Sequence, residues 1–94
     1  MTDREITIQN RLGLHARASA KLVHIANRYT SSVSLIAGNG QKVNAKSILG
    51  ILILAAGKGT KLTLRCDGDD EKEAMEALCE LIDDRFGEDT EPTP

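Results

Sequence analysis

The sequence predicts an α+β fold in which three helices cover one face of a four-stranded antiparallel sheet. Two observations support this prediction. In short segments apolar side chains alternate with polar ones, as in half-buried strands, and in longer segments they recur every three or four residues, as in amphipathic helices. The resulting order, strand, helix, strand, strand, helix, strand, helix, is a split β-α-β arrangement with one extra helix. A chain of 94 residues, 40% of them hydrophobic, has the size and composition of one globular domain.

A strand and a long helix are expected first. Ile6 and Ile8 alternate with polar neighbours, which predicts a strand with one buried face. The glycine-containing segment Asn10–Leu14 is expected to be a loop. From Ala16 to about Tyr29, apolar residues form a stripe at helical spacing: Ala18, Leu22, Val23, Ile25, Ala26 and Tyr29. Basic residues recur on the opposite face: Arg17, Lys21, His24 and Arg28.

A hairpin and a second helix follow. Strands are predicted over Ser32–Ala37 and Gln41–Asn44, joined at Asn39-Gly40, because both central positions of a two-residue hairpin turn favour positive φ. The nine residues Ile48–Ala56 then contain no polar side chain, and their isoleucines also allow a buried strand. A short helix is favoured, because a serine that can cap it precedes this run and a glycine that can end it follows.

The last strand and helix complete the domain, which is expected to span residues 1–86. Leu62, Leu64 and Cys66 alternate with polar residues, and Asp69 or Asp70 is expected to cap a helix that ends at Arg85. The inner face of this helix is formed by Ala74, Leu78, Leu81 and Ile82. Residues 87–94 contain three acids, two prolines and no large apolar side chain, so we expect an acidic, disordered tail.

The distribution of charge bears on the partners of the chain. Residues 1–65 carry ten basic side chains and two acidic ones, whereas residues 66–94 carry two basic and twelve acidic ones. The positive half could attract nucleic acid, phosphate or an acidic protein surface. Nucleic acid is disfavoured because Tyr29 and Phe86 are the only aromatic residues available for base stacking.

Several other classes are also disfavoured. The longest run without a polar side chain, Ile48–Gly57, is much shorter than the roughly 20 apolar residues of a membrane helix, so no membrane insertion is expected. The N-terminus lacks the pattern of an export signal, which predicts a cytoplasmic protein. Cys66 and Cys79 are therefore expected to be buried thiols rather than a disulfide. They lack the spacing of a metal site, and the two histidines lie far apart, so no metal is expected.

The segment Gly13-Leu14-His15-Ala16-Arg17 combines the residue types that phosphoryl chemistry needs. His15 falls at or beside the start of a helix, where backbone N–H groups and the helix dipole bind anions. The Arg17 guanidinium can bind phosphate oxygens, and an imidazole beside such a site can hold a phosphoryl group on a ring nitrogen. Spacing alone leaves open that His15 only caps the helix and that Arg17 is a solvated cation. His24 has no loop or glycine nearby and is expected to be a surface histidine.

This segment, together with Asn44-Ala45-Lys46-Ser47-Ile48-Leu49-Gly50, closely resembles the HPr family, the histidine-containing phosphocarriers of the phosphoenolpyruvate-dependent phosphotransferase system. The resemblance runs from the first strand to Arg85 and implies an open-faced β-sandwich with strand order 1-4-2-3. It implies that the Nδ1 atom of His15 accepts the phosphoryl group and that Ala16 and Arg17 bind it. Enzyme I would be the donor and enzyme IIA domains the acceptors, and the carrier, a monomer, would need no cofactor.

Two positions extend the comparison with this family. Ala18 stands where many members have a proline that would stiffen the first turn of the helix. Alanine is compatible with the chemistry, and also with a regulatory carrier of the nitrogen-related phosphotransfer branch, which is the alternative function. Ser47 matches the serine that HPr kinase/phosphorylase modifies in some bacteria, although its role as a helix cap requires no further purpose. A small enzyme or ligand-binding domain has less support, because no second catalytic group or glycine-rich loop accompanies His15.

The second helix is also expected to contribute a docking surface. It has too many apolar residues for one buried face, so Ile51 and Leu54 are expected to face the sheet while Ile48, Leu49 and Leu52 lie partly exposed. An exposed apolar cluster commonly marks a protein interface, and association with lipid or with itself is the alternative. The resemblance places a rim of cations around this cluster, beside His15: Arg17, Lys21 and Lys46.

Overall fold

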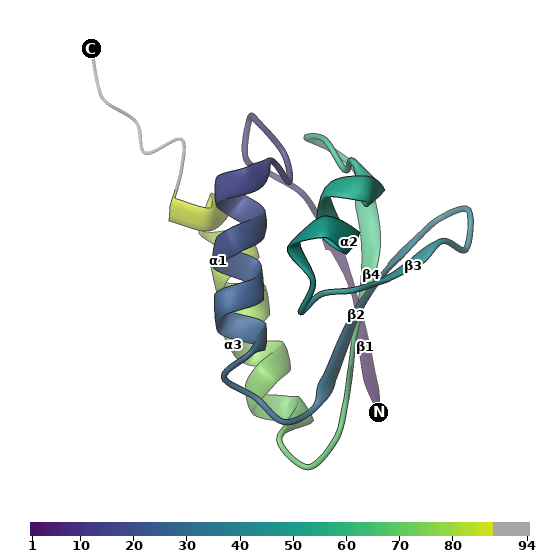
Figure 1. The fold of residues 1–94 in the computed structure, drawn as a ribbon, viewed down its shortest axis with the longest axis vertical. Helices are drawn as coiled ribbons and strands as arrows, with labels where there is room; N and C mark the ends of the chain where they lie inside the picture. Colours follow the sequence, from purple (N-terminus) through teal and green to yellow (C-terminus); the bar gives the residue numbers. More distant parts are fainter. Residues whose placement is uncertain (88–94) are drawn as a thin grey trace.

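The computed structural model describes residues 1–87, which form one four-stranded antiparallel sheet with three helices on one face (Figure 1). The strands are β1 (Thr2–Thr7), β2 (Ser32–Ala37), β3 (Lys42–Asn44) and β4 (Lys61–Asp67). The helices are α1 (Ala16–Ala26), α2 (Ile48–Leu54) and α3 (Glu71–Asp83), followed by a short 3₁₀ turn, η1 (Arg85–Gly87). The strand order is β1-β4-β2-β3, so the predicted fold class and strand order are confirmed. Of the predicted tail, Gly87 belongs to η1, and residues 88–94 lie outside the described part of the chain.

The sheet has one apolar and one polar face, as the alternation of side chains requires. Leu64 at the centre of β4 pairs with Arg4 of β1 and with Leu35 of β2. On the opposite face, Asp3 and Arg65 are directly paired across β1 and β4, and two hydrogen bonds of 2.8 and 2.9 Å join their side chains. The Arg65 guanidinium holds the pKa of the Asp3 carboxyl below its usual range.

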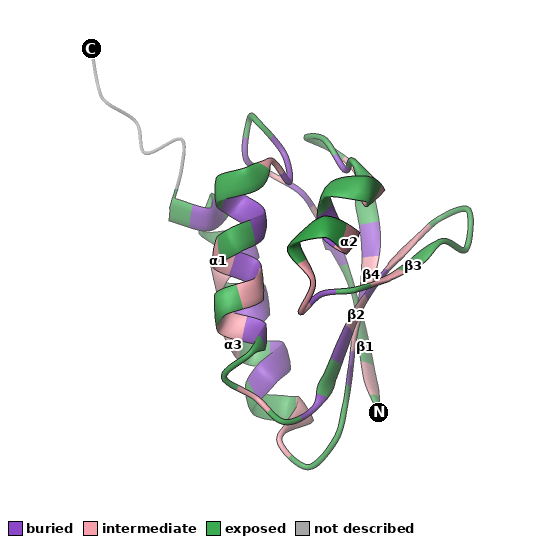
Figure 2. Ribbon diagram, in the orientation of Figure 1, coloured by how far each residue is buried: buried purple, intermediate pink, exposed green. Residues whose placement is uncertain are grey.

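The core lies between the apolar face of the sheet and the inner faces of the helices (Figure 2). Leu22 of α1, Ile51 of α2 and Leu78 of α3 are fully buried against it. The large buried side chains of the strands are Ile6, Val33, Leu35, Leu62 and Leu64. Figure 2 shows the buried side of each helix turned toward the sheet, so one core supports all three helices. No helix within residues 1–87 is both long and apolar enough to cross a bilayer.

Helices α1 and α3 end earlier than the sequence predicts. Helix α1 ends at Ala26 rather than near Tyr29, because the backbone N–H groups of Arg28 and Tyr29 bond three residues back and tighten the chain into a turn. Helix α3 ends at Asp83 rather than Arg85, because Arg85 and Phe86 adopt left-handed φ values of 55° and 57°. The reversal places the Phe86 side chain in the core.

Helix α2 also ends earlier than predicted, at Leu54 instead of Ala56. Ala55 adopts φ 54° and ψ 40°, the left-handed conformation that usually selects glycine after a helix. Gly57 is therefore not the terminator. The reversal at Ala55 buries Ala56 and directs its carbonyl toward the backbone N–H of Leu14, 2.8 Å away.

The β2–β3 hairpin is present, but its turn differs from the predicted one. The backbone N–H of Ala37 donates to Gln41 at 2.8 Å, which leaves three residues, 38–40, in the loop. Of the Asn39-Gly40 pair, only Gly40 has a positive φ, 90°. The Asn39 side chain instead accepts the backbone N–H of Gln41 at 2.9 Å, so it stabilises the turn through its amide oxygen.

Asp70 is the N-cap residue directly before α3, yet its side chain forms no capping bond with that helix. Its carboxylate accepts the backbone N–H groups of Thr30 and Ser31 at 2.8 and 2.9 Å, and the Ser31 hydroxyl as well. The hydrogen bond from the Ser31 hydroxyl and the bond from the Thr30 backbone lower the pKa of Asp70 to about 2. The residue predicted as a helix cap thus joins the start of α3 to the loop between α1 and β2.

Candidate functional site

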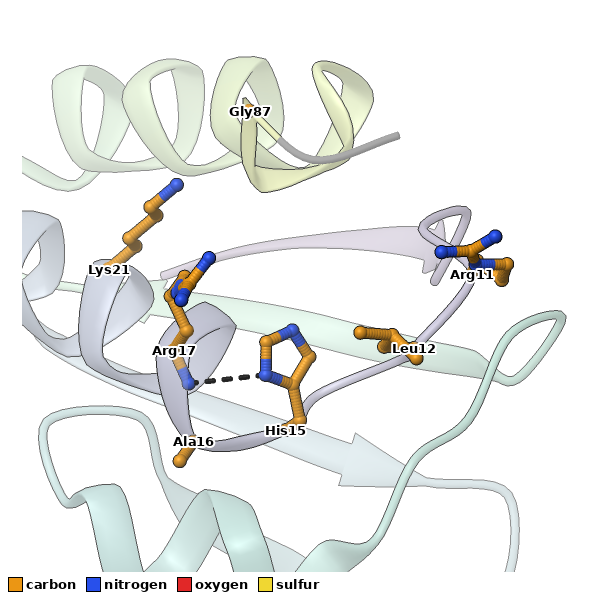
Figure 3. Close-up of a pocket in the computed structure, with 7 residues that line it drawn as sticks. All are labelled: Arg11, Leu12, His15, Ala16, Arg17, Lys21 and Gly87. Carbon is orange, nitrogen blue, oxygen red and sulfur yellow. Dashed lines mark hydrogen bonds between the residues drawn. The ribbon is translucent and has the colours of Figure 1, made fainter. Parts of the chain in front are cut away.

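An open hollow lies at the N-terminal end of α1, beside His15 (Figure 3). Its volume is about 560 Å³, and its lining residues are Arg11, Leu12, His15, Ala16, Arg17, Lys21 and Gly87. Three of these side chains are cationic and none is acidic. The lining therefore favours an anionic ligand.

A loop closed by hydrogen bonds presents His15 to this hollow. The Asn10 side chain, which is fully buried, donates to the Gly13 carbonyl at 2.7 Å, and the Gly13 N–H donates back to the Asn10 carbonyl at 3.1 Å. The Leu14 N–H then donates to the carbonyl of Ala56, which fastens the loop to the chain that follows α2. Gly13 has φ 69°, and a Cβ there would lie 2.6 Å from the Ala56 oxygen, so this position requires glycine.

His15 is the N-cap of α1, as the sequence predicts. Its Nδ1 atom accepts the backbone N–H of Arg17 at 3.3 Å, an arrangement that requires an unprotonated Nδ1 (Figure 3). In the neutral ring the proton is then on Nε2. The first backbone bond of the helix runs from the Ser19 N–H to the His15 carbonyl, so the N–H groups of Ala16, Arg17 and Ala18 precede it. This end of the helix can donate hydrogen bonds to an anion.

The two cations of α1 in the hollow differ in their contacts. Arg17 is exposed, and no carboxylate within residues 1–87 forms an ion pair with its guanidinium. The Lys21 ammonium donates to the Phe86 carbonyl at 2.6 Å and is half-buried. Arg17 is thus the more available cation for a ligand, whereas Lys21 fastens the end of the domain to α1.

Lys46 does not lie beside His15, contrary to the predicted rim. Helices α1 and α2 run in opposite directions, so the start of α2 is near the end of α1 (Figure 1). There the Lys46 ammonium donates to the Tyr29 carbonyl at 2.8 Å. His15 is instead near the end of α2, as the bond between Leu14 and Ala56 shows.

The exposed side of α2 agrees with its apolar pattern (Figure 2). Ile51 is fully buried and Leu54 half-buried, whereas Ile48, Leu49 and Leu52 are 42%, 68% and 38% exposed. Two further apolar residues, Leu12 and Ile53, are more than 60% exposed. The sequence contained a signal for Ile53, which lies four residues after Leu49 and therefore on the same helix face. Leu12 had none, because its exposure depends on the turn that Asn10 closes.

The remaining residues considered from the sequence have structural positions. Ser47 is the N-cap of α2, and its hydroxyl oxygen accepts the Gly50 N–H at 3.1 Å, as predicted. His24 is exposed on α1 and does not line the hollow. Both cysteines are buried and unbridged, and burial raises the pKa of Cys66 to about 11. Residues 1–87 contain no cluster of three or more His, Cys, Asp or Glu side chains that could hold a metal ion.

Comparisons with known proteins show the family of the chain. The family model for the PTS HPr component phosphorylation site matches residues 2–84. The phosphocarrier protein HPr of Cupriavidus necator is 56% identical over 88 residues, which cover 94% of this chain and 98% of that protein. A crystal structure of HPr-C-His from Thermoanaerobacter tengcongensis superposes with a TM-score of 0.90 at 44% identity, covering 95% of this chain and 99% of that one.

A crystal structure described as an HPr dimer, from the same organism, has a TM-score of 0.75 at 43% identity, with 94% of this chain and 100% of that one covered. The predicted monomeric state therefore stays a prediction. The relatives nevertheless cover almost the whole chain, and the family model spans every residue of the hollow except Gly87. The chain belongs to the HPr family, the phosphocarrier proteins of the phosphotransferase system.

Proposed function

We propose that His15 is the phosphoryl-accepting residue of this phosphocarrier, with enzyme I as donor and an enzyme IIA domain as acceptor. The observation that supports this assignment best is the contact of His15 Nδ1 with the Arg17 N–H at the start of α1. It combines an unprotonated ring nitrogen with an anion-binding helix end. His24, the other histidine, has no comparable surroundings.

The transfer step needs no cofactor. The lone pair of Nδ1 attacks phosphorus, and the bond between phosphorus and the donor breaks in the same displacement. The Nε2 proton remains on the ring, which becomes a cation and so a good leaving group for onward transfer. Passing the phosphoryl group to an acceptor nucleophile breaks the Nδ1–phosphorus bond and restores the neutral ring.

The start of α1 would stabilise the phosphoryl group once it is attached. A bond from Nδ1 to phosphorus uses the lone pair that accepts the Arg17 N–H, which frees that N–H to donate to a phosphoryl oxygen. The Ala16 N–H also precedes the first bond of the helix and can act in the same way. The exposed Arg17 guanidinium would supply charge-assisted hydrogen bonds from the hollow.

The exposed side of α2 would dock the partners. Ile48, Leu49 and Leu52 form its apolar centre. The loop that carries His15 to the hollow is bonded to the chain just after the C-terminal end of this helix, through Leu14 and Ala56. Lys46 would meet a partner at the opposite end, beside Ser47. Cationic residues at the edge of such a surface speed encounter with an acidic partner, and the apolar centre determines how long the complex lasts.

Ser47 would be the regulatory position, modified by HPr kinase/phosphorylase where that enzyme is present. Its hydroxyl is at the start of α2, where a phosphate is compatible with the helix dipole. The same phosphate would add roughly −1.5 to −2 charges next to the docking residues Lys46 and Ile48. Repulsion of an acidic partner would follow, with the fold retained.

One experiment tests the main proposal. By this proposal the chain is a monomer in the cytoplasm. In the experiment, the full chain is incubated with phosphoenolpyruvate and enzyme I. An acid-labile, base-stable phosphate should then appear on one histidine.

The buried Ala18, where many members of the family have proline, keeps the nitrogen-related branch as the second candidate function. Faster phosphorylation by the nitrogen-branch enzyme I than by the sugar-branch enzyme I would favour it.

A further inference from the structure

Leu12 is an exposed apolar side chain next to the proposed nucleophile. It is 63% exposed and lines the hollow together with His15. Figure 3 shows Leu12 and Arg11 on one side of the imidazole, and Arg17 and Lys21 on the other. The docking residues proposed on α1 and α2 leave the side with Leu12 and Arg11 without a role.

Arg11 and Leu12 are the two central residues of a turn whose base is fixed. The backbone N–H of Gly13 donates to the Asn10 carbonyl at 3.1 Å, and the buried Asn10 side chain donates to the Gly13 carbonyl at 2.7 Å. The backbone N–H of His15 donates to the same Gly13 carbonyl at 2.9 Å. The turn and the proposed nucleophile thus share one acceptor, so the fold sets their relative position before any partner binds.

The two side chains of the turn offer complementary contacts. Leu12 presents an apolar side chain at a position where turns usually carry glycine, proline or small polar residues. Arg11 is exposed and lines a hollow that has three cations and no acid. An apolar side chain beside a cation fits a protein surface that holds an apolar contact and a carboxylate close together. A small phosphorylated molecule would use the cation and leave Leu12 uncovered.

The turn is also connected to the exposed end of α2. The Leu14 N–H, two residues after Leu12, donates to the Ala56 carbonyl at 2.8 Å, just beyond that helix. Ile53, in the last turn of α2, is 62% exposed. A partner that docks on α2 and reaches His15 therefore meets the loop that carries Leu12.

We propose that the Arg11–Leu12 turn is part of the docking surface for the phosphoryl donor, with Leu12 in an apolar contact and Arg11 paired with a carboxylate of that partner. The inference rests on the proposed function and deepens it, because it assigns contacts on the second side of His15. The occupant is a protein whose own phosphoryl group is flanked by apolar and acidic side chains. Enzyme I is the probe, since the proposed function makes it the donor.

The test uses full-length chains with one substitution each. Leu12→Gln removes the apolar contact, and Leu12→Met keeps an apolar side chain of similar volume. Arg11→Gln removes the cation, and Arg28→Gln, at an exposed position of α1's C-terminal side outside the hollow, is the matched control. Each protein is phosphorylated by enzyme I with phosphoenolpyruvate and, separately, by phosphoramidate, a small anionic donor that needs no partner protein.

Leu12→Gln should raise the KM of enzyme I for the chain about tenfold at low and at high salt, because it removes an apolar contact. Leu12→Met should restore most of this loss. Arg11→Gln should slow phosphorylation by enzyme I about three- to tenfold at low ionic strength and much less at about 1 M salt. With phosphoramidate its rate should fall at most about twofold, the effect of one charge about 10 Å away in water. Arg28→Gln should match the wild type with both donors.

Four results would overturn the inference. The first is a wild-type rate with enzyme I for Leu12→Gln or Arg11→Gln, and the second is an equal loss with both donors, which would mean that the turn acts on His15 itself. The third is an equal loss in Arg28→Gln, which would mean that only net charge matters. The fourth is unfolding of Leu12→Gln, detected by circular dichroism, which would place this side chain in the core. A wild-type chain that reacts with phosphoramidate at His15 but never with enzyme I contradicts the proposed function instead.

Discussion

The backbone N–H of Arg17 and the Nδ1 atom of His15 are 3.3 Å apart, and this contact joins the proposed nucleophile to the helix that would receive its phosphate. The contact depends on a neutral ring, because a protonated Nδ1 has no lone pair to accept the N–H. It also orients the imidazole before any donor arrives. The exposed guanidinium of Arg17 belongs to the same residue, so one position contacts the imidazole through its backbone and lines the hollow with its side chain.

His15→Ala should abolish labelling from phosphoenolpyruvate in the presence of enzyme I, because the variant lacks the nucleophilic nitrogen. His24→Ala should be labelled at close to the wild-type rate, since His24 is exposed outside the hollow. Quantifying acid-labile phosphate on each protein checks both expectations. Stoichiometric labelling of the His15 variant would end the assignment.

Ser47→Asp should fold normally and accept phosphate more slowly, because it brings a negative charge to the start of α2 beside the docking residues. Ser47→Ala is the matched control: it should lose about 1 kcal/mol of unfolding free energy with its cap and transfer phosphate at the normal rate. Urea denaturation and transfer kinetics measure the two effects separately. If Ser47→Asp and authentic phosphoserine both transfer normally, Ser47 has no inhibitory role.

Leu49→Asp should weaken transfer while leaving the fold intact, because this side chain is 68% exposed. Replacing a central docking residue of this kind should raise the dissociation constant for enzyme I by roughly tenfold or more. Ile51→Asp places the same charge two residues away in the core and should unfold the protein. Circular dichroism and binding titrations distinguish the two, and an unfolded Leu49 variant would show that the residue belongs to the core.

Asp70→Asn should be less stable than the wild type at neutral pH, and the difference should disappear in acid. The pKa of Asp70 is lowered from 3.8 to about 2 in the folded protein, so its stabilising effect is present above pH 4. That effect is lost as the pH falls from about 4 to about 2. Urea denaturation at several pH values measures the free energy of unfolding of both proteins, and Asp69→Asn, at an exposed position, is the control. Parallel stability curves for wild type and Asp70→Asn would contradict it.

Ala55→Gly should raise the free energy of unfolding by about 0.5–1 kcal/mol, because glycine adopts the left-handed conformation at the end of α2 without the cost of a Cβ. The greater freedom of glycine in the unfolded chain offsets part of that gain. Ala20→Gly, at an exposed position inside α1, is the control and should destabilise by a similar amount. Thermal unfolding measures the stability of both variants, and an Ala55→Gly variant less stable than the wild type would contradict this prediction.

Local sequence was sufficient to predict the features that a few neighbouring side chains determine. The apolar residues of α2 cannot all face one core, so exposure of Ile48, Leu49 and Leu52 followed from their number alone. The loop and helix start around His15 were also predictable, because Gly13, His15 and Arg17 act within five positions of one another.

Contacts between distant segments explain what the sequence did not predict. The end of α2 depends on the bond from Leu14 to Ala56, and the position of Lys46 depends on the opposite directions of α1 and α2. The far wall of the hollow comes from Gly87, which the Lys21 bond to Phe86 brings across 65 positions of sequence. No periodicity within a helix or strand contains such information.

The strand order has a consequence for how the chain folds during its synthesis. Within residues 1–87, β1 forms strand pairs only with β4, which begins at Lys61, so Ile6 leaves the ribosome long before its partner Leu62 exists. At about 5–20 residues per second, the interval is roughly 3–11 s. Only the β2–β3 hairpin is local enough to form earlier. Until β4 emerges, the first strand is unpaired and its buried side chain, Ile6, has no core to enter, so the sheet is completed only after two thirds of the chain has been made.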